Sequence, residues 1–261
     1  MTVAEAIERA RRLLDEGRLD EALQALLETA ESHPDPDLEL EIALLYTERG
    51  IARPDDEAMK DFDEAETWAE LPLTMAAKAG VLLRRGALAE AEALLGRALE
   101  LDAEMPEGLL GKARLRLAQG RVDEAGELAA AVVQSSPRTG EAWLFLAEVL
   151  DRAGRKDDAA RALEEGLRHD AGNGALLAAL GCRSAEGPDP RAAARTLERA
   201  VAIDPANAGA WRALALARAR AGDEVGMHRA LDRALELHPE GTRGWLEEAR
   251  RKEPLLGAYA G

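Results

Sequence analysis

Hydrophobic positions recur along the chain at helical spacing, in stretches that come in pairs. In residues 140–173, Trp143, Leu146, Ala147 and Leu150 fall on one face of a helix. A glycine follows, and a second helical face continues through the rest of the stretch. No run alternates with a period of two, so nothing indicates strands. The pattern predicts pairs of amphipathic helices.

The helix pairs repeat with a period of 34 residues. One position of the period holds Gly86, Gly120, Gly154, Pro188 and Gly222. The position five residues later holds Ala91, Ala125, Ala159, Ala193 and Met227, and the position four residues after that holds Leu95, Ala129, Leu163, Leu197 and Leu231. A fixed period of this length indicates one small helical unit copied many times, each copy packing mainly on its neighbours.

The turn inside each unit has its own signals. Gly154 is suited to the left-handed residue that ends a helix, and Asp157 is expected to cap the helix that follows. Gly17 with Asp20 and Gly120 with Asp123 repeat this arrangement.

At this level of detail the units resemble tetratricopeptide repeats, whose pattern is Trp-x2-Leu-Gly-x2-Tyr, then Ala-x3-Phe, then Pro. The matching residues are Trp143 with Leu146, Trp211 with Leu214, Leu177 with Leu180, Ala58 with Phe62, Ala159 with Leu163, Ala193 with Leu197, and Pro34, Pro137, Pro205 and Pro239. The resemblance implies an all-α fold, a right-handed superhelical α-solenoid of about seven helix-turn-helix repeats plus a C-terminal capping helix.

We expect a single solenoid over residues 1–261. Its units are predicted at 3–36, 37–71, 72–105, 106–139, 140–173, 174–207 and 208–241, with a capping helix and short tail at 242–261. The second unit is irregular, and residues 52–56 are expected to lengthen its turn. The tail from Pro254 is expected to dock on the last unit; packing into a neighbour's groove and disorder are the alternatives.

The resemblance also implies a groove lined by the first helix of each unit. The candidate groove residues are Leu40, Leu44, Ala76, Leu83, Leu110, Arg114, Leu117, Leu144, Glu148, Asp151, Ala178, Cys182, Arg212 and Leu216. This set is mostly apolar, which suits a partner's amphipathic helix or extended segment with an apolar stripe. The alternative for each leucine or alanine is burial between helices, since one residue of register turns a side chain by about 100°.

The charge of the chain is concentrated at its start. The net charge is −16, and residues 1–71 hold 21 Asp and Glu against 7 Lys and Arg, a net −14. Such a chain repels phosphate backbones, which argues against nucleic-acid binding. Residues 55–70 are the most acidic segment. They either dock a basic partner or form a solvated helix face without one.

The cysteine count and the search for targeting and membrane segments indicate the cellular compartment. Cys182 is the single cysteine, which fits a reducing compartment and is expected to be a small buried residue. No secretory signal and no membrane-spanning run are present in the sequence. We therefore expect a cytoplasmic protein, and 29 Arg against 5 Lys favours a bacterial source.

Nothing in the sequence indicates catalysis. The histidines at 33, 169, 228 and 238 lack metal-ligand spacing, and the glycine-rich phosphate-binding motifs are absent. We expect no catalytic, cofactor or metal site and no enzyme activity. The sequence favours a non-catalytic scaffold or adaptor that binds a protein or peptide partner. The alternatives are a homo-oligomeric assembly element and a small-molecule-binding or enzymatic repeat protein.

Overall fold

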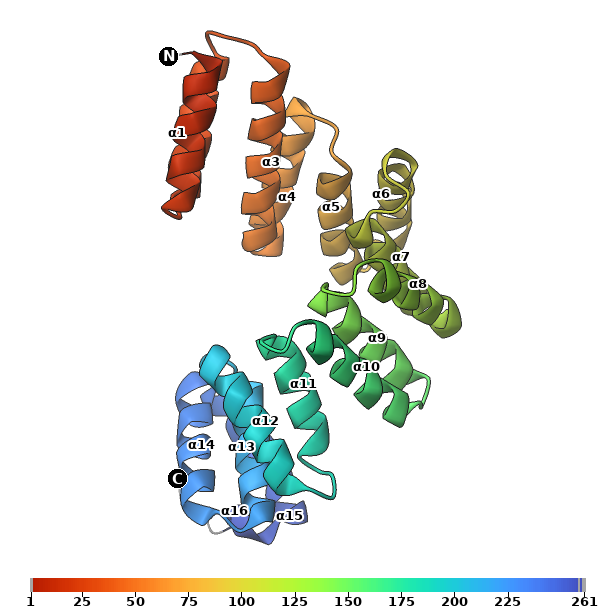
Figure 1. Cartoon of the computed structure of the whole chain (residues 1–261), viewed down its shortest axis with the longest axis vertical. Helices are drawn as coiled ribbons and strands as arrows, with labels where there is room; N and C mark the ends of the chain where they lie inside the picture. The colour runs from red at the N-terminus through yellow and green to blue at the C-terminus, as the bar shows by residue number, and fades with distance from the viewer. Residues whose placement is uncertain (1, 258, 260–261) are drawn as a thin grey trace. The chain divides into compact units, whose positions relative to one another are not determined.

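The computed structural model describes residues 2–257 and 259, and within them the chain forms helices without any strand (Figure 1). The all-helical fold class expected from the sequence is confirmed. The chain divides into two compact bodies, the N-terminal body Met1–Leu128 and the C-terminal body Ala129–Gly261. No helix in the described part of the chain is long and apolar enough to cross a membrane.

The helices follow one another in pairs. The N-terminal body contains α1 (Val3–Asp15), α2 (Leu19–Ala30), α3 (Pro36–Ala52), α4 (Asp55–Trp68), α5 (Pro72–Arg84), α6 (Leu88–Leu101) and α7 (Pro106–Ala118). The boundary between the bodies falls inside α8 (Val122–Ser135). The C-terminal body contains α9 (Gly140–Arg152), α10 (Lys156–His169), α11 (Gly174–Ser184), α12 (Pro190–Ile203), α13 (Ala208–Ala221), α14 (Glu224–Leu237), α15 (Pro239–Lys252) and α16 (Pro254–Gly257).

The first helices of successive pairs lie side by side in each body. In the N-terminal body α1 contacts α3, α3 contacts α5, and α5 contacts α7. In the C-terminal body the same is true of α9, α11, α13 and α15. The second helices pack against both neighbouring first helices, as α4 does against α3 and α5. Each body therefore has one face made from first helices only, which we call its first-helix face.

The periodic alanines lie where helices approach most closely. Ala22, Ala91, Ala125, Ala159 and Ala193 are each 0 or 1% exposed. A larger side chain at these points would hold the helices apart, whereas the leucines four residues later fill the space between them. The 34-residue period thus reports positions of close packing.

Each regular turn between the two helices of a pair is set by one glycine. Gly17, Gly86, Gly120, Gly154 and Gly222 have positive φ values of 73 to 79°, which glycine adopts without a steric penalty. This confirms the left-handed conformation expected at Gly154.

The expected cap at Asp157 is wrong. The residue directly after the glycine is the N-cap, which is Arg155 in α10 and Asp223 in α14. Asp223 accepts a hydrogen bond from the Gly226 amide, whereas Asp157 already lies in the first turn of α10. There its negative charge still interacts favourably with the positive N-terminal end of the helix dipole.

The second unit departs from the others in a way that the sequence did not predict. Residues 52–56 do not lengthen the turn; instead α3 continues through Gly50 to Ala52, and α4 begins at Asp55. Gly50 is buried inside α3, and a Cβ atom there would come within 2.6 Å of the Phe62 ring. The extra length of the unit therefore goes into a helix of 17 residues.

The segment after α15 docks on the C-terminal body, which confirms the expected placement of the part of the tail that the structure describes. Leu256 is 0% exposed in the same core as Leu231 and Leu246. The Tyr259 hydroxyl donates to Asp232 at 2.6 Å, and the Arg250 guanidinium donates to the carbonyls of Leu256 and Tyr259. Residues 258, 260 and 261 of the predicted tail lie outside the described residues.

Candidate partner-binding face

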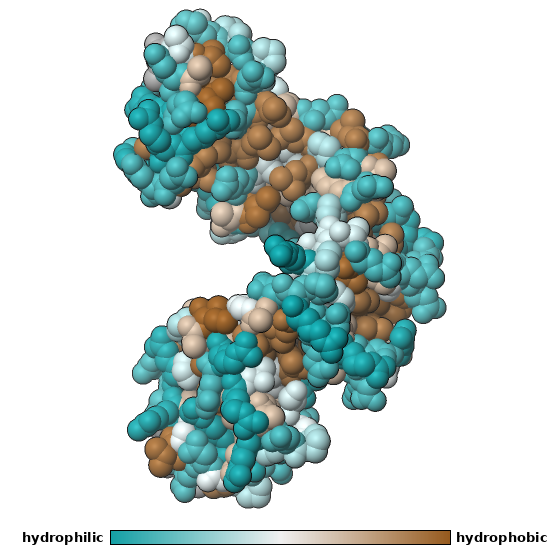
Figure 2. Space-filling model, in the orientation of Figure 1, coloured by the Kyte–Doolittle hydropathy of each residue, from teal (hydrophilic) through white to brown (hydrophobic). Residues whose placement is uncertain are grey.

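Exposed apolar side chains gather on α3, in the first-helix face of the N-terminal body. Leu40, Leu44 and Ile51 are 43, 38 and 58% exposed. The other large hydrophobic residues with comparable exposure in the described chain are Leu101, Ile203 and Val225, which lie on three different helices. Hydrophobic surface over α3 to α5 is visible in Figure 2. We call Leu40, Leu44 and Ile51 the α3 ridge.

An acidic edge runs along the α3 ridge. Asp37, Glu41 and Glu48 lie on the same helix, and Glu41 pairs with Arg11 of α1 at 3.0 Å. Within the described residues, the carboxylates of Asp37 and Glu48 contact no Lys or Arg. On the opposite flank, buried Thr47 forms a hydroxyl–hydroxyl hydrogen bond of 2.6 Å with Thr74 of α5. The exposed strip of α3 thus lies between α1 and α5.

The other predicted groove residues of the N-terminal body are less accessible. Leu110 and Leu117 of α7 are 2 and 8% exposed. Leu83 packs against the core around Leu82 and Leu95, and Arg114 is half-buried and already engaged in contacts within the protein. The leucines of α7 therefore serve packing between helices, and of the predicted residues only Leu40 and Leu44 are exposed in this body.

The predicted groove residues of the C-terminal body have partners within it. Glu148 pairs with Arg152 along α9, and Asp151 pairs with Arg183 of α11. Arg212 donates to the Gly241 carbonyl at 3.0 Å, while Leu144 is half-buried. Asp151 and Arg212 therefore hold neighbouring first helices together, whereas the Glu148 pair stays within α9.

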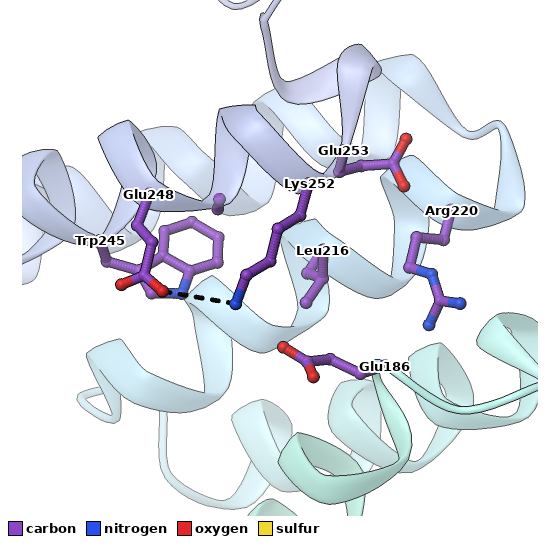
Figure 3. A pocket seen from close by; sticks show the side chains of 8 residues that line it. Glu186, Leu216, Arg220, Trp245, Glu248, Lys252 and Glu253 are labelled. Atoms are coloured by element: carbon purple, nitrogen blue, oxygen red, sulfur yellow. Dashed lines mark hydrogen bonds and ion pairs between the residues drawn. The ribbon is translucent and has the colours of Figure 1, made fainter.

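A cavity of about 430 Å³ opens on the first-helix face of the C-terminal body (Figure 3). Leu216 of α13 and Trp245 of α15 supply apolar walls, and charged side chains form the rim. On this rim Lys252 pairs with Glu248 at 3.3 Å, and Arg220 donates to the carbonyls of Ala185 and Gly187. The cavity thus combines apolar walls with a charged rim.

The acidic segment 55–70 is paired inside the protein. Asp55 and Asp56 pair with Arg84 and Arg85, each at 2.6 Å, and hydrogen bonds from Arg84 lower the pKa of Asp55. Asp61 is 3% exposed and is held by Arg49 at 2.6 Å and Arg53 at 3.3 Å.

Two carboxylates of the same segment pair with the lysine of α5. Lys78 binds Asp63 and Glu66, each at 2.7 Å. Burial lowers the pKa of Lys78, but these hydrogen bonds outweigh burial and leave that pKa raised. Glu57 and Glu70 pair with Arg53 and Arg97. The segment therefore links neighbouring helices, which neither of the two expectations from the sequence included.

Cys182 is exposed, so the expectation of a buried cysteine is wrong. It lies on α11, in the first-helix face of the C-terminal body. Surrounding atoms desolvate the sulfur and raise the pKa of the thiol, and nearby Arg212 only partly offsets this. At neutral pH the thiol is protonated, which makes it a poor nucleophile.

Candidate catalytic and metal-binding groups do not converge. In the described part of the chain, no three His, Cys, Asp or Glu side chains are grouped so that they could hold a metal ion. His169 stacks on Trp143 with ring centroids 6.1 Å apart, and His238 caps α15 by accepting a hydrogen bond from the Gly241 amide. Both histidines have structural contacts of their own.

Comparison with known proteins identifies the repeats. Family models described as tetratricopeptide repeat match residues 7–72, 82–138, 117–181 and 179–226, which together cover most of the chain. The chain belongs to the tetratricopeptide repeat family. No curated protein matches it.

Solved structures share the repeat fold at low sequence identity. A tetratricopeptide repeat protein from Parabacteroides merdae is 14% identical with a TM-score of 0.63, covering 95% of this chain and 98% of that one. PilF of Pseudomonas aeruginosa is 16% identical with a TM-score of 0.64, covering 82 and 97%. YrrB, described as having an unusual peptide-binding site, is 17% identical with a TM-score of 0.50, covering 76 and 98%.

In this tetratricopeptide repeat protein, a structural role of the periodic tryptophans becomes clear. Trp143 and Trp211 each donate the indole N–H to the carbonyl of the proline six residues earlier, Pro137 and Pro205, at 2.8 and 3.0 Å. The hydrogen bond ties the start of a first helix to the loop that enters it. Sequence reasoning missed Trp245 as a cavity wall, which depends on the packing of α15 beside α13. It also missed Ile51 as part of the α3 ridge, although the helical spacing of Ile51 from Leu40 and Leu44 could have shown it.

Proposed function

We propose that this tetratricopeptide repeat protein is a non-catalytic adaptor that binds a protein or peptide partner on the first-helix face of its N-terminal body. The fold is generally a scaffold for protein–protein interaction. The observation that supports this role most directly is the α3 ridge, where three large apolar side chains are exposed on one helix. Apolar patches on otherwise polar surfaces commonly mark interaction sites.

The α3 ridge is suited to binding because the chain leaves it unused. Leu38 and Ile42 on the same helix are 0% exposed and already supply the core contacts of α3. Burying the exposed parts of Leu40, Leu44 and Ile51 against a partner would contribute about 1 kcal/mol for each side chain. We propose the cavity beside Trp245 of the C-terminal body as a separate contact surface for an apolar part of a partner.

Capture of the partner from cell extract tests the proposal. We expect wild-type protein to retain a specific protein and the Leu40→Glu, Leu44→Glu double variant to lose it, because two charges would replace the apolar contact. Both leucines are exposed and lie outside the core, so helicity should not change, and circular dichroism checks this.

The matched control is Leu101→Glu, which places the same charge on a side chain that is 55% exposed on the second helix α6. This variant should retain the partner. Equal retention by the double variant and wild type would count against binding through the α3 ridge. Loss in the control as well would point to a general effect of added charge.

A further inference from the structure

The apolar and acidic positions of α3 form two parallel stripes. At about 100° per residue, Leu40, Ile51 and Leu44 fall within a sector of about 40°, and Asp37, Glu48 and Glu41 fall in the next 60°. The apolar stripe lies on the side of α5, where Thr47 contacts Thr74. The acidic stripe lies on the side of α1, where Glu41 contacts Arg11. A partner on α3 would therefore meet both stripes at once.

Two of the three carboxylates of the acidic stripe, those of Asp37 and Glu48, are available to a partner, whereas Glu41 is paired with Arg11. Seven of the eight carboxylates between residues 55 and 70 are paired with Arg or Lys of neighbouring helices and turns. In contrast, Asp37 and Glu48 are exposed, and no basic side chain of the described chain pairs with them. The first-helix face of the N-terminal body thus presents unpaired negative charge beside the α3 ridge.

We propose that the α3 ridge binds an amphipathic helix in which an apolar stripe is flanked on one side by Lys or Arg. This rests on the proposed function and adds the chemistry of the partner. The 17 residues of α3 give a surface about 25 Å long, which suits a helix of similar length laid along it. Basic side chains placed opposite Asp37 and Glu48 orient that helix and speed its association, and the gain falls as salt rises.

Two synthetic peptides test this chemistry. One is a fluorescein-labelled helix of about 18 residues with leucines on one face and lysines along one flank; the other carries glutamates in place of the lysines. Fluorescence anisotropy should show the lysine peptide binding about tenfold more tightly than the glutamate peptide at low salt, because two or three exposed ion pairs separate them. The preference should shrink at physiological salt.

Charge reversal on α3 makes the test specific. In the Asp37→Lys, Glu48→Lys variant the preference should switch to the glutamate peptide. The control variant Glu31→Lys, Glu100→Lys makes the same change of net charge at exposed positions at the ends of second helices, and it should keep the wild-type preference.

Each outcome decides the matter. Equal binding of the two peptides, no binding of either, or a preference that reversal leaves unchanged overturns the basic-helix proposal. If the native partner is still lost from the Leu40→Glu, Leu44→Glu variant in that case, the adaptor function stands and only the chemistry of the partner is wrong. If the reversal control alone switches the preference, the acidic contact lies elsewhere on the N-terminal body.

Discussion

At the scale of single residues, the packing of α3 on α4 requires a glycine at position 50, because a side chain there would meet Phe62. The Phe62 ring occupies the space where a Cβ of residue 50 would lie, with 2.6 Å between them. We predict that Gly50→Ala destabilises the protein by about 1–3 kcal/mol, because Phe62 must leave its rotamer or the helices must separate.

The same substitution at Gly96 should have the opposite sign. Gly96 lies within α6, and nothing lies within 4 Å of its missing Cβ. Alanine there should stabilise by about 0.5–1 kcal/mol through helix propensity. Urea denaturation followed by circular dichroism measures both. A Gly50→Ala protein as stable as Gly96→Ala would show that the contact with Phe62 is not tight.

The sequence predicts residues of this kind only where they follow the period. The left-handed glycines and buried alanines repeat every 34 residues, so one position explains the others. Gly50 lies near the expected turn position, yet its role comes from Phe62, 12 residues away, and no local signal shows that contact. Asp157 was misplaced by two residues because the glycine leaves room for a single cap residue, Arg155.

At the scale of helices, ion pairs join neighbouring units. An Arg near the end of one first helix reaches an Asp at the start of the preceding second helix, 29 residues earlier, as in Arg49 with Asp20 and Arg84 with Asp55. This spacing is visible in the sequence, but the partners can be assigned only when the angle between helices is known. For this reason residues 55–70 were interpreted as a free acidic surface.

A more buried ion pair, between Arg49 of α3 and Asp61 of α4 in the same unit, gives a prediction about helix association. Asp61→Ala should lower the free energy of unfolding by about 2 kcal/mol, because it removes a charged acceptor that is 3% exposed and leaves Arg49 without it. The control is Asp56→Ala, whose side chain is 96% exposed in its pair with Arg85 and should leave the denaturation midpoint within error. Similar losses in both variants would mean that burial does not strengthen the contact.

The pKa of Tyr259 should show whether the segment after α15 is docked on the C-terminal body or released from it. Burial and the hydrogen bond to Asp232 raise the pKa of Tyr259 to about 12. A raised pKa means that the fold favours the neutral phenol, so this contribution to stability is complete below pH 10 and is lost as the pH rises toward 12.

Tyrosinate absorbance measures this in a Tyr46→Phe background, where Tyr259 is the remaining tyrosine. We expect a midpoint near pH 12 that moves down toward 10 when Leu256→Glu undocks the segment. A midpoint near 10 before undocking would contradict the docked position of Tyr259.

At the scale of the whole molecule, the family and the helical pairs follow from the period, whereas the binding surface follows only in part. Leu40 and Leu44 were predicted from their place in the first helix. Leu110 and Leu117 satisfied the same pattern, yet they are only 2 and 8% exposed. Helical periodicity alone cannot separate an exposed leucine from one covered by an adjacent unit.

The proposed adaptor function depends on a partner that contacts the protein at α3. The most direct measurement is site-specific photo-crosslinking in the native cell, with benzoylphenylalanine at position 44 and, separately, at position 101. We predict that the probe at Leu44 forms a crosslink to a distinct protein and that the probe at Leu101, which is more exposed, does not. Crosslinks at neither position, or the same crosslinks at both, would contradict binding through the α3 ridge.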